Sequence, residues 1–234
     1  MNTIVLVHGA WSGAHGFRKV RPTLRDSGFD VYTPSLTGIG ERSHLTGPTV
    51  NLTTHIHDVV NTILYEDLTD ITLLGFSYGG MVVSGALQHI GDRVKHLIYL
   101  DAFLPSDGDS ADTLRGSSAS KPISIEQCWT LPPASRILND SADQDWFGPR
   151  RSAQPAATFA ERVSLPRAVN DYTCSLSYIK ATADESEPAD SAFWRAAATA
   201  KTSSRWNYYE VASNHMVAIN SPRELVGLVK EITM

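Results

Sequence analysis

The sequence has few cysteines, no long apolar run and no excess of positive charge. Cys128 and Cys174 are too few for a disulfide framework and form no Cys-x-x-Cys pair, so we interpret both as reduced thiols. No apolar run approaches the roughly 18 residues of a membrane span. The 234 residues carry a formal net charge of -5 without a cluster of Lys and Arg, so neither a membrane nor a nucleic acid is indicated as a partner.

The N-terminal segment, MNTIVLVHGAW, lacks the basic region of a signal peptide, and its apolar run is too short for one. Together with two reduced thiols, this favours a cytoplasmic protein. Apolar residues make up 42% of the chain and charged residues 19%, which is ordinary for a soluble globular protein. None of these features sets the oligomeric state, and a homodimer is left open.

Short apolar segments alternate with segments of helical spacing along most of the chain. From Asn51 to about Leu68, for example, Ile56, Val59 and Ile63 fall on one helical face. Such alternation is typical of the α/β class, with a mostly parallel sheet covered by helices on both faces. The expected strands cover residues 3–7, 29–36, 70–75, 94–103, 176–182 and 205–211.

Between about residues 104 and 170 this alternation stops, and the chain becomes rich in Ser, Asp, Pro and Ala. A structureless loop of that length inside one domain would be unusual. We therefore predict a single domain over residues 1–234. Residues 104–170 are expected to form a small helical cap, inserted after the strand that follows the helix at 79–90.

Residues 75–79 read Gly-Phe-Ser-Tyr-Gly and match the G-x-S-x-G pattern at a strand-to-helix turn. A serine in such a turn points its hydroxyl away from the sheet, while Gly75 and Gly79 leave room where strand and helix pass closely. The helix that follows directs its free N–H groups toward the site. The alternative is a Gly-rich turn with a capping serine, but the strand-turn-helix context favours Ser77 as a nucleophile.

A serine hydroxyl needs a base to take its proton, and eight histidines are candidates. His55 and His57 are two apart on a helix and face different ways, while His89 and His96 are expected at the surface. His215 lies between the last apolar strand and the last helix. Since that loop falls at the carboxyl edge of the strands, where ligand sites form, His215 is the expected base, with a structural, hydrogen-bonded histidine as the alternative.

The third member of such a site is a carboxylate that orients the imidazole. The chain order Ser, Asp or Glu, His points to the segment YIKATADESEP, which offers Asp184, Glu185 and Glu187. Asp184 comes first after the strand and has the shortest side chain. Asp101, at the end of the strand HLIYLDAF, is the second candidate, with a structural role as its favoured interpretation. Asp184 is therefore the expected acid.

The carbonyl oxygen of an ester becomes negative during attack and needs preorganised donors. One donor is expected from the backbone N–H of Tyr78, which directly follows the nucleophile. The other is expected from the loop after the first strand, VHGAW, in which Gly9 lets the backbone turn and Ala10 offers its N–H.

With these residues in place, the chain resembles the α/β-hydrolases related to plant methylesterases and hydroxynitrile lyases, and most closely their bacterial esterase relatives. The resemblance runs from near Ile4 to near Leu228 and implies a triad at Ser77, Asp184 and His215, with oxyanion donors at Ala10 and Tyr78. The TAD step after YIKA supports Asp184 over Asp101. The segments that carry the resemblance are LVHGAW, TGIGERSHL, HIHDVVNTI, GFSYGGMV, LIYLDAFLP, YIKATAD and NHMVAINSPREL.

Two positions depart from these relatives. Phe76 stands where many relatives have a histidine directly before the nucleophile, a position outside the triad. The lyases carry a lysine directly after the catalytic histidine and a threonine directly after the strand-ending histidine. This chain has Met216 and Gly9 at those positions, so both lyase features are missing.

We therefore predict a serine esterase that cleaves small carboxylic esters through an acyl-enzyme intermediate. Trp11, Phe103 and Trp129 are the expected walls of its pocket, and neither a metal nor an organic cofactor is implied. A lyase or another non-hydrolytic enzyme on the same triad is one alternative, because fold and triad do not fix the reaction. A small-molecule-binding protein with little turnover is the other.

Overall fold

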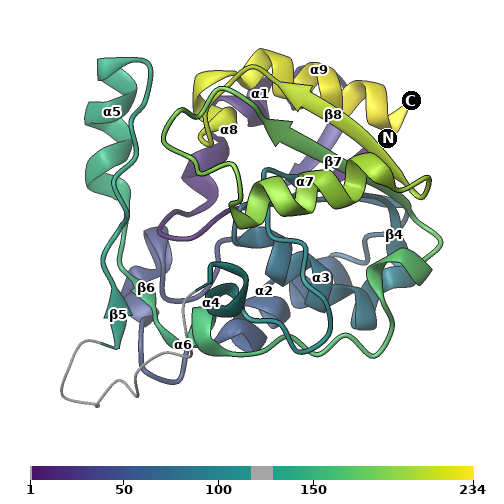
Figure 1. Ribbon diagram of the computed structural model, residues 1–234, viewed down its shortest axis with the longest axis horizontal. Coiled ribbons are helices and arrows are strands. Elements are labelled where there is room, and N and C mark those ends of the chain that lie inside the picture. The colour runs from purple at the N-terminus through teal and green to yellow at the C-terminus, as the bar shows by residue number, and fades with distance from the viewer. Residues whose placement is uncertain (1, 117–128) are drawn as a thin grey trace.

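The computed structural model describes residues 2–116 and 129–234. Within them, six parallel strands form one sheet in the order β2-β1-β3-β4-β7-β8 (Figure 1). This confirms the predicted α/β class with a mostly parallel sheet. The second strand ends at Tyr32, before Pro34, which has no N–H to give to a ladder. The bounds are β1 (Asn2–Val7), β2 (Phe29–Tyr32), β3 (Ile71–Phe76), β4 (Val94–Leu100), β7 (Ser175–Ala181) and β8 (Trp206–Val211).

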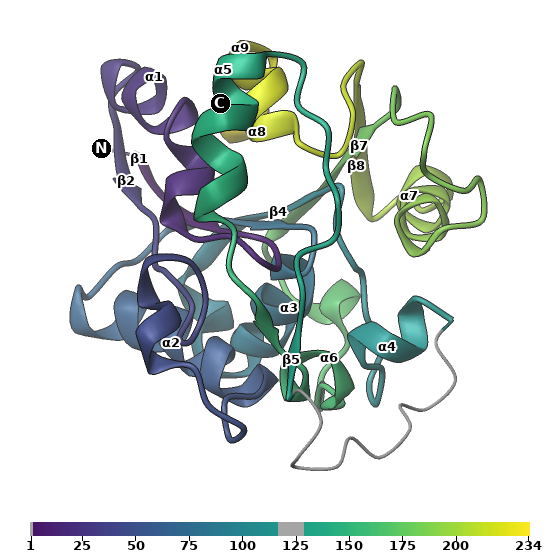
Figure 2. The same ribbon diagram turned by 90° about the vertical axis from the view of Figure 1, so that its left-hand side faces the viewer.

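Helices cover both faces of this sheet (Figure 2). Leu73 packs in the core on the side of α2 and α3, and its neighbour Leu74 packs on the side of α1 and α9. Because successive strand residues enter opposite cores, the strands have nearly continuous apolar sequences. One face carries α2 (Leu52–Tyr65), α3 (Gly79–Ile90) and α7 (Ala192–Thr202), and the other α1 (Val20–Asp26), α8 (Val217–Asn220) and α9 (Pro222–Thr233).

The segment between β4 and β7 contains short helices and a strand pair. Its elements are α4 (Ala111–Leu114), β5 (Thr130–Leu131), α5 (Ser141–Phe147), β6 (Gln154–Pro155) and α6 (Ala157–Ala160). No sequence pattern predicts the antiparallel pairing of β5 with β6. Phe147 of α5 packs in the core beside α1, and Phe159 of α6 packs in the core beside α2. The inserted segment therefore contacts the layers on both sides of the sheet.

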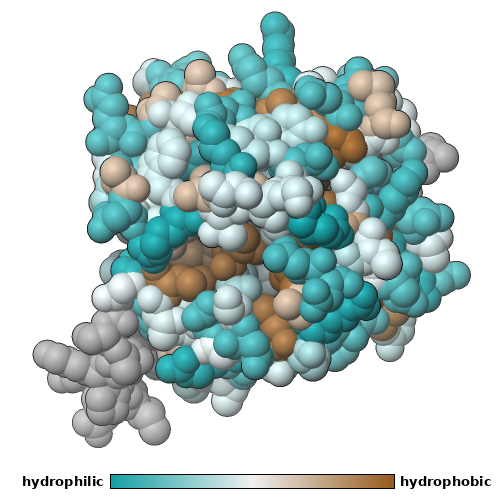
Figure 3. Space-filling model, turned by 45° about the vertical axis from the view of Figure 1, so that its right-hand side comes forward, coloured by the Kyte–Doolittle hydropathy of each residue, from teal (hydrophilic) through white to brown (hydrophobic). Residues whose placement is uncertain are grey.

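Short 3-10 helices connect the main elements. They cover Ala14–Phe17, Gly40–Leu45, Gly91–Arg93, Gly148–Arg150 and Val169–Asp171. The surface in Figure 3 is mostly hydrophilic, with hydrophobic residues gathered in its hollows. An apolar hollow on a polar surface is a usual mark of a ligand site. Among residues 2–116 and 129–234, no helix has both the length and the apolar character that crossing a membrane requires.

The connection between β3 and α3 is tight enough to require two glycines. A Cβ atom on Gly75 would lie 2.8 Å from the carbonyl oxygen of Gly79. A Cβ atom on Gly79 would lie 2.7 Å from the carbonyl oxygen of Val7. Both distances are shorter than a carbon–oxygen contact allows, so the strand and the helix can approach this closely only without those side chains.

Ser77 lies between these glycines with a φ of 55°, in the left-handed region that few side chains adopt. Its amide donates to the carbonyl oxygen of Leu100 at 3.1 Å, and its carbonyl oxygen accepts from the amide of Phe103 at 3.1 Å. The strained turn is thus held by the end of β4 and the residues after it.

The close approach at Gly79 predicts a selective loss of stability. Gly79→Ala should lower the free energy of unfolding by about 1–3 kcal/mol or more, because its methyl group overlaps the β1 backbone. Gly227→Ala is the matched control, since no atom lies within 4 Å of a Cβ atom at that position in α9. The control should gain about 0.5–1 kcal/mol from helix propensity. Equal urea-unfolding midpoints for the two variants would contradict this account of the turn.

Candidate active site

Ser77, His215 and Asp101 form a hydrogen-bonded chain at the carboxyl edge of the sheet. The Nδ1 atom of His215 lies 2.6 Å from Oδ2 of Asp101, and the Nε2 atom lies 2.9 Å from the Ser77 hydroxyl oxygen. Because a carboxylate only accepts hydrogen bonds, Nδ1 carries the proton toward Asp101. Nε2 is then left with a lone pair that can accept the hydroxyl proton of Ser77.

The carboxylate on the imidazole is Asp101, so the predicted contact between Asp184 and the His215 ring is wrong. Asp101 directly follows β4 with a φ of 41°, and its amide donates to the carbonyl oxygen of Ile179 at 2.8 Å. This backbone geometry turns a fully buried carboxylate toward the ring. The interpretation of Asp101 as a structural residue is corrected accordingly.

Asp184 contacts the backbone of His215 instead of its ring. Its Oδ2 atom accepts from the His215 amide at 3.3 Å, and its Oδ1 atom accepts from the amide of Ser186 at 3.1 Å and from that residue's hydroxyl. Burial alone would raise the pKa of Asp184, but the hydrogen bonds from Ser186 and His215 outweigh it and lower that pKa. Asp184 therefore stabilises the loop that carries the imidazole.

Two phenylalanines enclose the His215 ring. The ring of Phe193 stacks on the imidazole with centroids 4.9 Å apart and planes 12° apart, and the ring of Phe76 lies 4.9 Å away on a tilted plane. Phe76, which departs from the histidine of many relatives, thus packs against the imidazole. The two rings restrict the orientations open to His215.

The backbone amides of Ala10 and Tyr78 line the same cavity as Ser77. Within the described residues, neither amide donates a hydrogen bond to another group of the protein. Trp11 follows Ala10 with a φ of 59°, and its amide donates to the side-chain oxygen of Gln154 at 3.1 Å. The inserted segment therefore holds the turn that presents the Ala10 amide.

The side chain of Tyr78 is held by a hydrogen bond to His55. The Nε2 atom of His55 donates to the carbonyl oxygen of Thr37 at 2.8 Å, so its Nδ1 atom accepts from the Tyr78 hydroxyl at 3.1 Å. Burial lowers the pKa of His55 to about 4 and raises the pKa of Tyr78 well above its ordinary value. Both side chains are therefore neutral and support the turn at Ser77.

A cavity of about 590 Å³ opens over Ser77. Trp11 and Phe103 line it as predicted, and Phe159, Phe193 and three arginines at 115, 136 and 195 line it without having been predicted. Trp129 does not line this cavity, so the prediction for it is wrong. The carbonyl oxygen of Trp129 accepts from the amide of Ala156, which ties it to the strand pair β5–β6.

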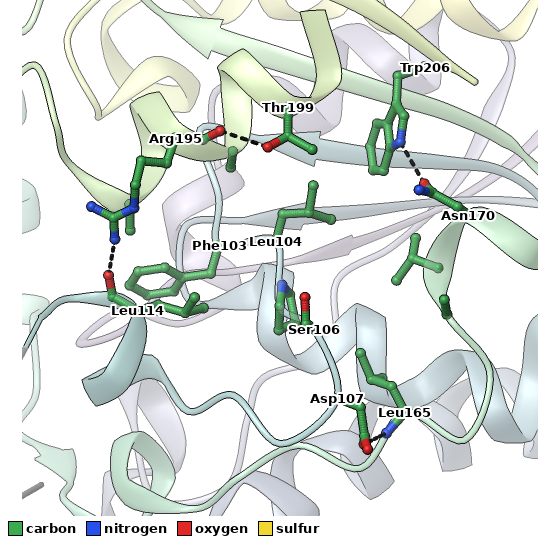
Figure 4. A pocket seen from close by; sticks show the side chains of 15 residues that line it. Phe103, Leu104, Ser106, Asp107, Leu114, Leu165, Asn170, Arg195, Thr199 and Trp206 are labelled. Carbon is green, nitrogen blue, oxygen red and sulfur yellow. Dashed lines mark hydrogen bonds between the residues drawn. The ribbon is translucent and has the colours of Figure 1, made fainter. Parts of the chain in front are cut away.

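A second cavity, of about 310 Å³, shares part of its wall with the first. Phe103, Ala192 and Arg195 line both cavities. Arg195 donates to the carbonyl oxygen of Leu114, which joins α7 to α4 across the rim of the second cavity (Figure 4). The wall of the second cavity is mainly apolar and includes leucines from the inserted segment and the ring of Trp206.

Lys180, in β7, is a site residue that sequence reasoning missed. Its side chain is completely buried, and its Nζ atom lies 2.7 Å from Oδ1 of Asp101. The signal available in the sequence was a lysine inside an apolar strand, next to two residues that enter the core. A buried lysine needs a carboxylate partner, and this one is paired with the same Asp101 that contacts His215.

The other ionisable groups of the described chain do not form a metal site. Among residues 2–116 and 129–234, no group of three or more His, Cys, Asp and Glu is arranged to hold a metal ion. Cys174 is a buried free thiol, and burial raises its pKa. Cys128 lies outside the described residues.

Comparisons with known proteins identify the family. A family model described as the alpha/beta hydrolase family matches residues 4–228. The carbendazim hydrolyzing esterase of Nocardioides sp. (strain SG-4G) is 39% identical over 173 residues, which are 68% of this chain and 72% of that protein. The alpha-hydroxynitrile lyase of Arabidopsis thaliana is 32% identical over 104 residues, which are only 43% of this chain and 40% of that protein.

Among solved structures, an extracellular alpha/beta-hydrolase from a Paenibacillus species has a TM-score of 0.77 and 25% identity over 99% of both chains. It is described as sharing structural and functional homology with tobacco salicylic acid binding protein 2. The predicted resemblance to bacterial esterases and their plant relatives is therefore confirmed. From its fold and from the match over residues 4–228, this chain belongs to the alpha/beta hydrolase family.

Proposed function

We propose that this protein is a serine hydrolase that cleaves small carboxylic esters through an acyl-enzyme intermediate. The observation that carries the proposal is the hydrogen-bonded chain from Ser77 through His215 to Asp101, which opens onto a cavity beside two backbone amides. The similarity to a carbendazim hydrolyzing esterase, over 72% of that protein, supports ester hydrolysis.

In the proposed acylation step, the Ser77 oxygen attacks the ester carbonyl carbon while Nε2 of His215 takes the hydroxyl proton. Asp101 stabilises the positive imidazole that results, through the hydrogen bond on Nδ1. The carbonyl oxygen becomes negative and accepts from the amides of Ala10 and Tyr78. His215 then gives its proton to the alcohol oxygen, and the carbon–oxygen bond of the ester breaks.

Deacylation uses the same groups in the same order. A water molecule replaces the alcohol, His215 takes one of its protons, and the water oxygen attacks the acyl carbon of the Ser77 ester. The same two amides hold the second oxyanion. His215 returns the proton to the Ser77 oxygen, and the carboxylic acid leaves.

The size and the lining of the cavity over Ser77 favour a small substrate with apolar groups. Its volume of about 590 Å³ falls within the roughly 300–1,000 Å³ of typical ligand pockets. Aromatic side chains at Trp11, Phe103, Phe159 and Phe193 form much of its wall. Such walls bind apolar substituents by removing them from water.

Cyanohydrin cleavage is the alternative reaction, and the partial match to an alpha-hydroxynitrile lyase gives it a specific basis. A lyase that expels cyanide benefits from a cation next to the catalytic histidine. Met216, directly after His215, has a neutral thioether and cannot supply that charge. Gly9 likewise offers no hydroxyl to the substrate, so ester hydrolysis is favoured.

The cytoplasm is the proposed location, and this proposal rests on the two cysteines, which are too few for a disulfide framework. The similar Paenibacillus hydrolase is described as extracellular.

Replacing the nucleophile gives the first test of the proposed reaction. Ser77→Ala should lower kcat/KM for p-nitrophenyl acetate by roughly 10³-fold or more, because it removes the hydroxyl that contacts Nε2 of His215. The wild-type protein should also react with a fluorophosphonate, with the adduct on Ser77. Peptide mass spectrometry would locate that adduct.

Mandelonitrile serves as the matched substrate for the lyase alternative. The wild-type protein should release no more cyanide from it than the Ser77→Ala variant does. Cyanide release that depends on Ser77 and rivals the ester reaction would overturn the hydrolase proposal, as would a folded Ser77→Ala variant with near-native esterase activity.

The two aspartates beside His215 should differ sharply when each is replaced by asparagine. Asp101→Asn should lower kcat by on the order of 10²–10⁴-fold, because its amide N–H₂ favours the tautomer that cannot accept the Ser77 proton. Asp184→Asn should lower kcat by less than about 10-fold, since an amide oxygen can still accept from the His215 backbone N–H.

Circular dichroism and active-site titration would show that both variants fold and how many sites are intact. If both fold and Asp184→Asn is the more damaging, the acid is Asp184 and the assignment of Asp101 fails.

A further inference from the structure

The ammonium group of Lys180 lies at the centre of a buried ionic cluster. Its Nζ atom lies 2.7 Å from each of three acceptors, which are Oδ1 of Asp101, Oε2 of Glu187 and the carbonyl oxygen of Ala181. The ring of Trp194 covers it, with the centroid 4.4 Å away. The three N–H donors of the lysine are therefore all used, and Lys180 has no freedom to contact a substrate.

Asp101 is fixed from both sides by this arrangement. Its Oδ1 atom accepts from Lys180 and, at 3.4 Å, from the amide of Ala181, while its Oδ2 atom accepts from His215. Because the two oxygens have different partners, the carboxylate cannot rotate without breaking a charged hydrogen bond. Lys180 thereby determines the direction from which Asp101 approaches the imidazole.

The cluster also determines the charge that His215 meets. Asp101 and Glu187 are negative and Lys180 is positive, so together they present one net negative charge behind the ring. That charge is balanced when the imidazole takes up the Ser77 proton. Desolvation offsets much of the attraction within such buried ion pairs, but removing one member leaves the others unpaired and destabilises the fold.

Other ionisable groups lie around the cluster, and among them Asp184 adds a negative charge near His215, because its pKa is lowered. Asp184 contacts the backbone N–H of His215, on the loop after β7. Tyr178, on β7, is buried and donates its hydroxyl to the carbonyl oxygen of Ala102. Tyr208 is the residue paired with it on the neighbouring strand β8. Burial raises the pKa of both tyrosines, so both stay neutral wherever the enzyme works.

We propose that Lys180 is a positioning residue that, together with Glu187, fixes Asp101 and sets the charge against which His215 takes up the serine proton. This inference rests on the proposed esterase function. It assigns to Lys180 and Glu187 opposite effects on the pH dependence of the reaction.

The test compares two variants in the pH profile of kcat/KM for p-nitrophenyl acetate. Lys180→Met leaves two carboxylates in one buried site, where they hold a proton more tightly and also favour the protonated imidazole. Both effects move the acid limb to higher pH, by roughly one pH unit, and lower kcat. Glu187→Gln removes a negative charge with little change in shape. Its acid limb should move to lower pH, by roughly half a unit.

Lys201→Met is the matched control, because Lys201 lies near the C-terminal end of α7 and forms an exposed ion pair with Glu210. It should leave the acid limb and kcat unchanged. Rates are divided by the fraction of sites that react with a fluorophosphonate, so that a partly unfolded preparation does not lower the apparent kcat.

Shifts of opposite sign in the two variants would support the inference. Loss of stability in both variants with an unmoved acid limb would overturn it and leave Lys180 a purely structural residue. If Lys180→Met does not fold, Glu187→Gln decides alone, since an unmoved or raised acid limb in that variant also overturns the inference. A wild-type protein without Ser77-dependent ester turnover would instead defeat the proposed function.

Discussion

Ser77 has a φ of 55° between a strand and a helix whose backbones approach so closely that a methyl group on Gly79 would overlap the carbonyl oxygen of Val7. This turn connects the main parts of the site. The amide of Ser77 donates to the carbonyl oxygen of Leu100, and its carbonyl oxygen accepts from the amide of Phe103. Because Leu100 and Phe103 lie on either side of Asp101 in the chain, the positions of Ser77 and Asp101 depend on the same backbone contacts. The turn keeps its strained backbone conformation because hydrogen bonds to neighbouring elements hold it in place.

Aromatic contacts hold the two faces of the His215 imidazole, and hydrogen bonds hold its two nitrogens. Phe193 and Phe76 enclose its faces, Asp101 accepts from Nδ1, and the Ser77 hydroxyl lies at Nε2. Behind Asp101, Lys180 and Glu187 extend the polar chain into the interior. A low-dielectric surrounding strengthens each of these interactions, and it makes any unpaired member costly. The buried charges therefore act as a unit, in which removing one group changes the others.

Ser77 and His215 can be predicted as site residues from local sequence patterns, because the strand-turn-helix motif and the order of parallel strands bring both to one edge of the sheet. The carboxylate that contacts the His215 ring could not be chosen in this way. Asp101 and Asp184 both follow strands that end at this edge, and the choice depends on a positive φ at Asp101 and on its pairing with Lys180. The position of Trp129 depends on the pairing of β5 with β6, which has only two residues in each strand and no periodic signal.

The central claim is that Ser77 attacks a carbonyl whose oxygen is held by the amides of Ala10 and Tyr78, with Asp101 behind His215. A crystal structure of the protein inhibited by a fluorophosphonate tests this most directly, because the tetrahedral phosphorus mimics the intermediate. We expect phosphorus bonded to the Ser77 oxygen, the phosphoryl oxygen about 2.7–3.1 Å from both amide nitrogens, and Nδ1 of His215 on Asp101. A phosphoryl oxygen turned away from these amides, or an imidazole on Asp184, would contradict the account.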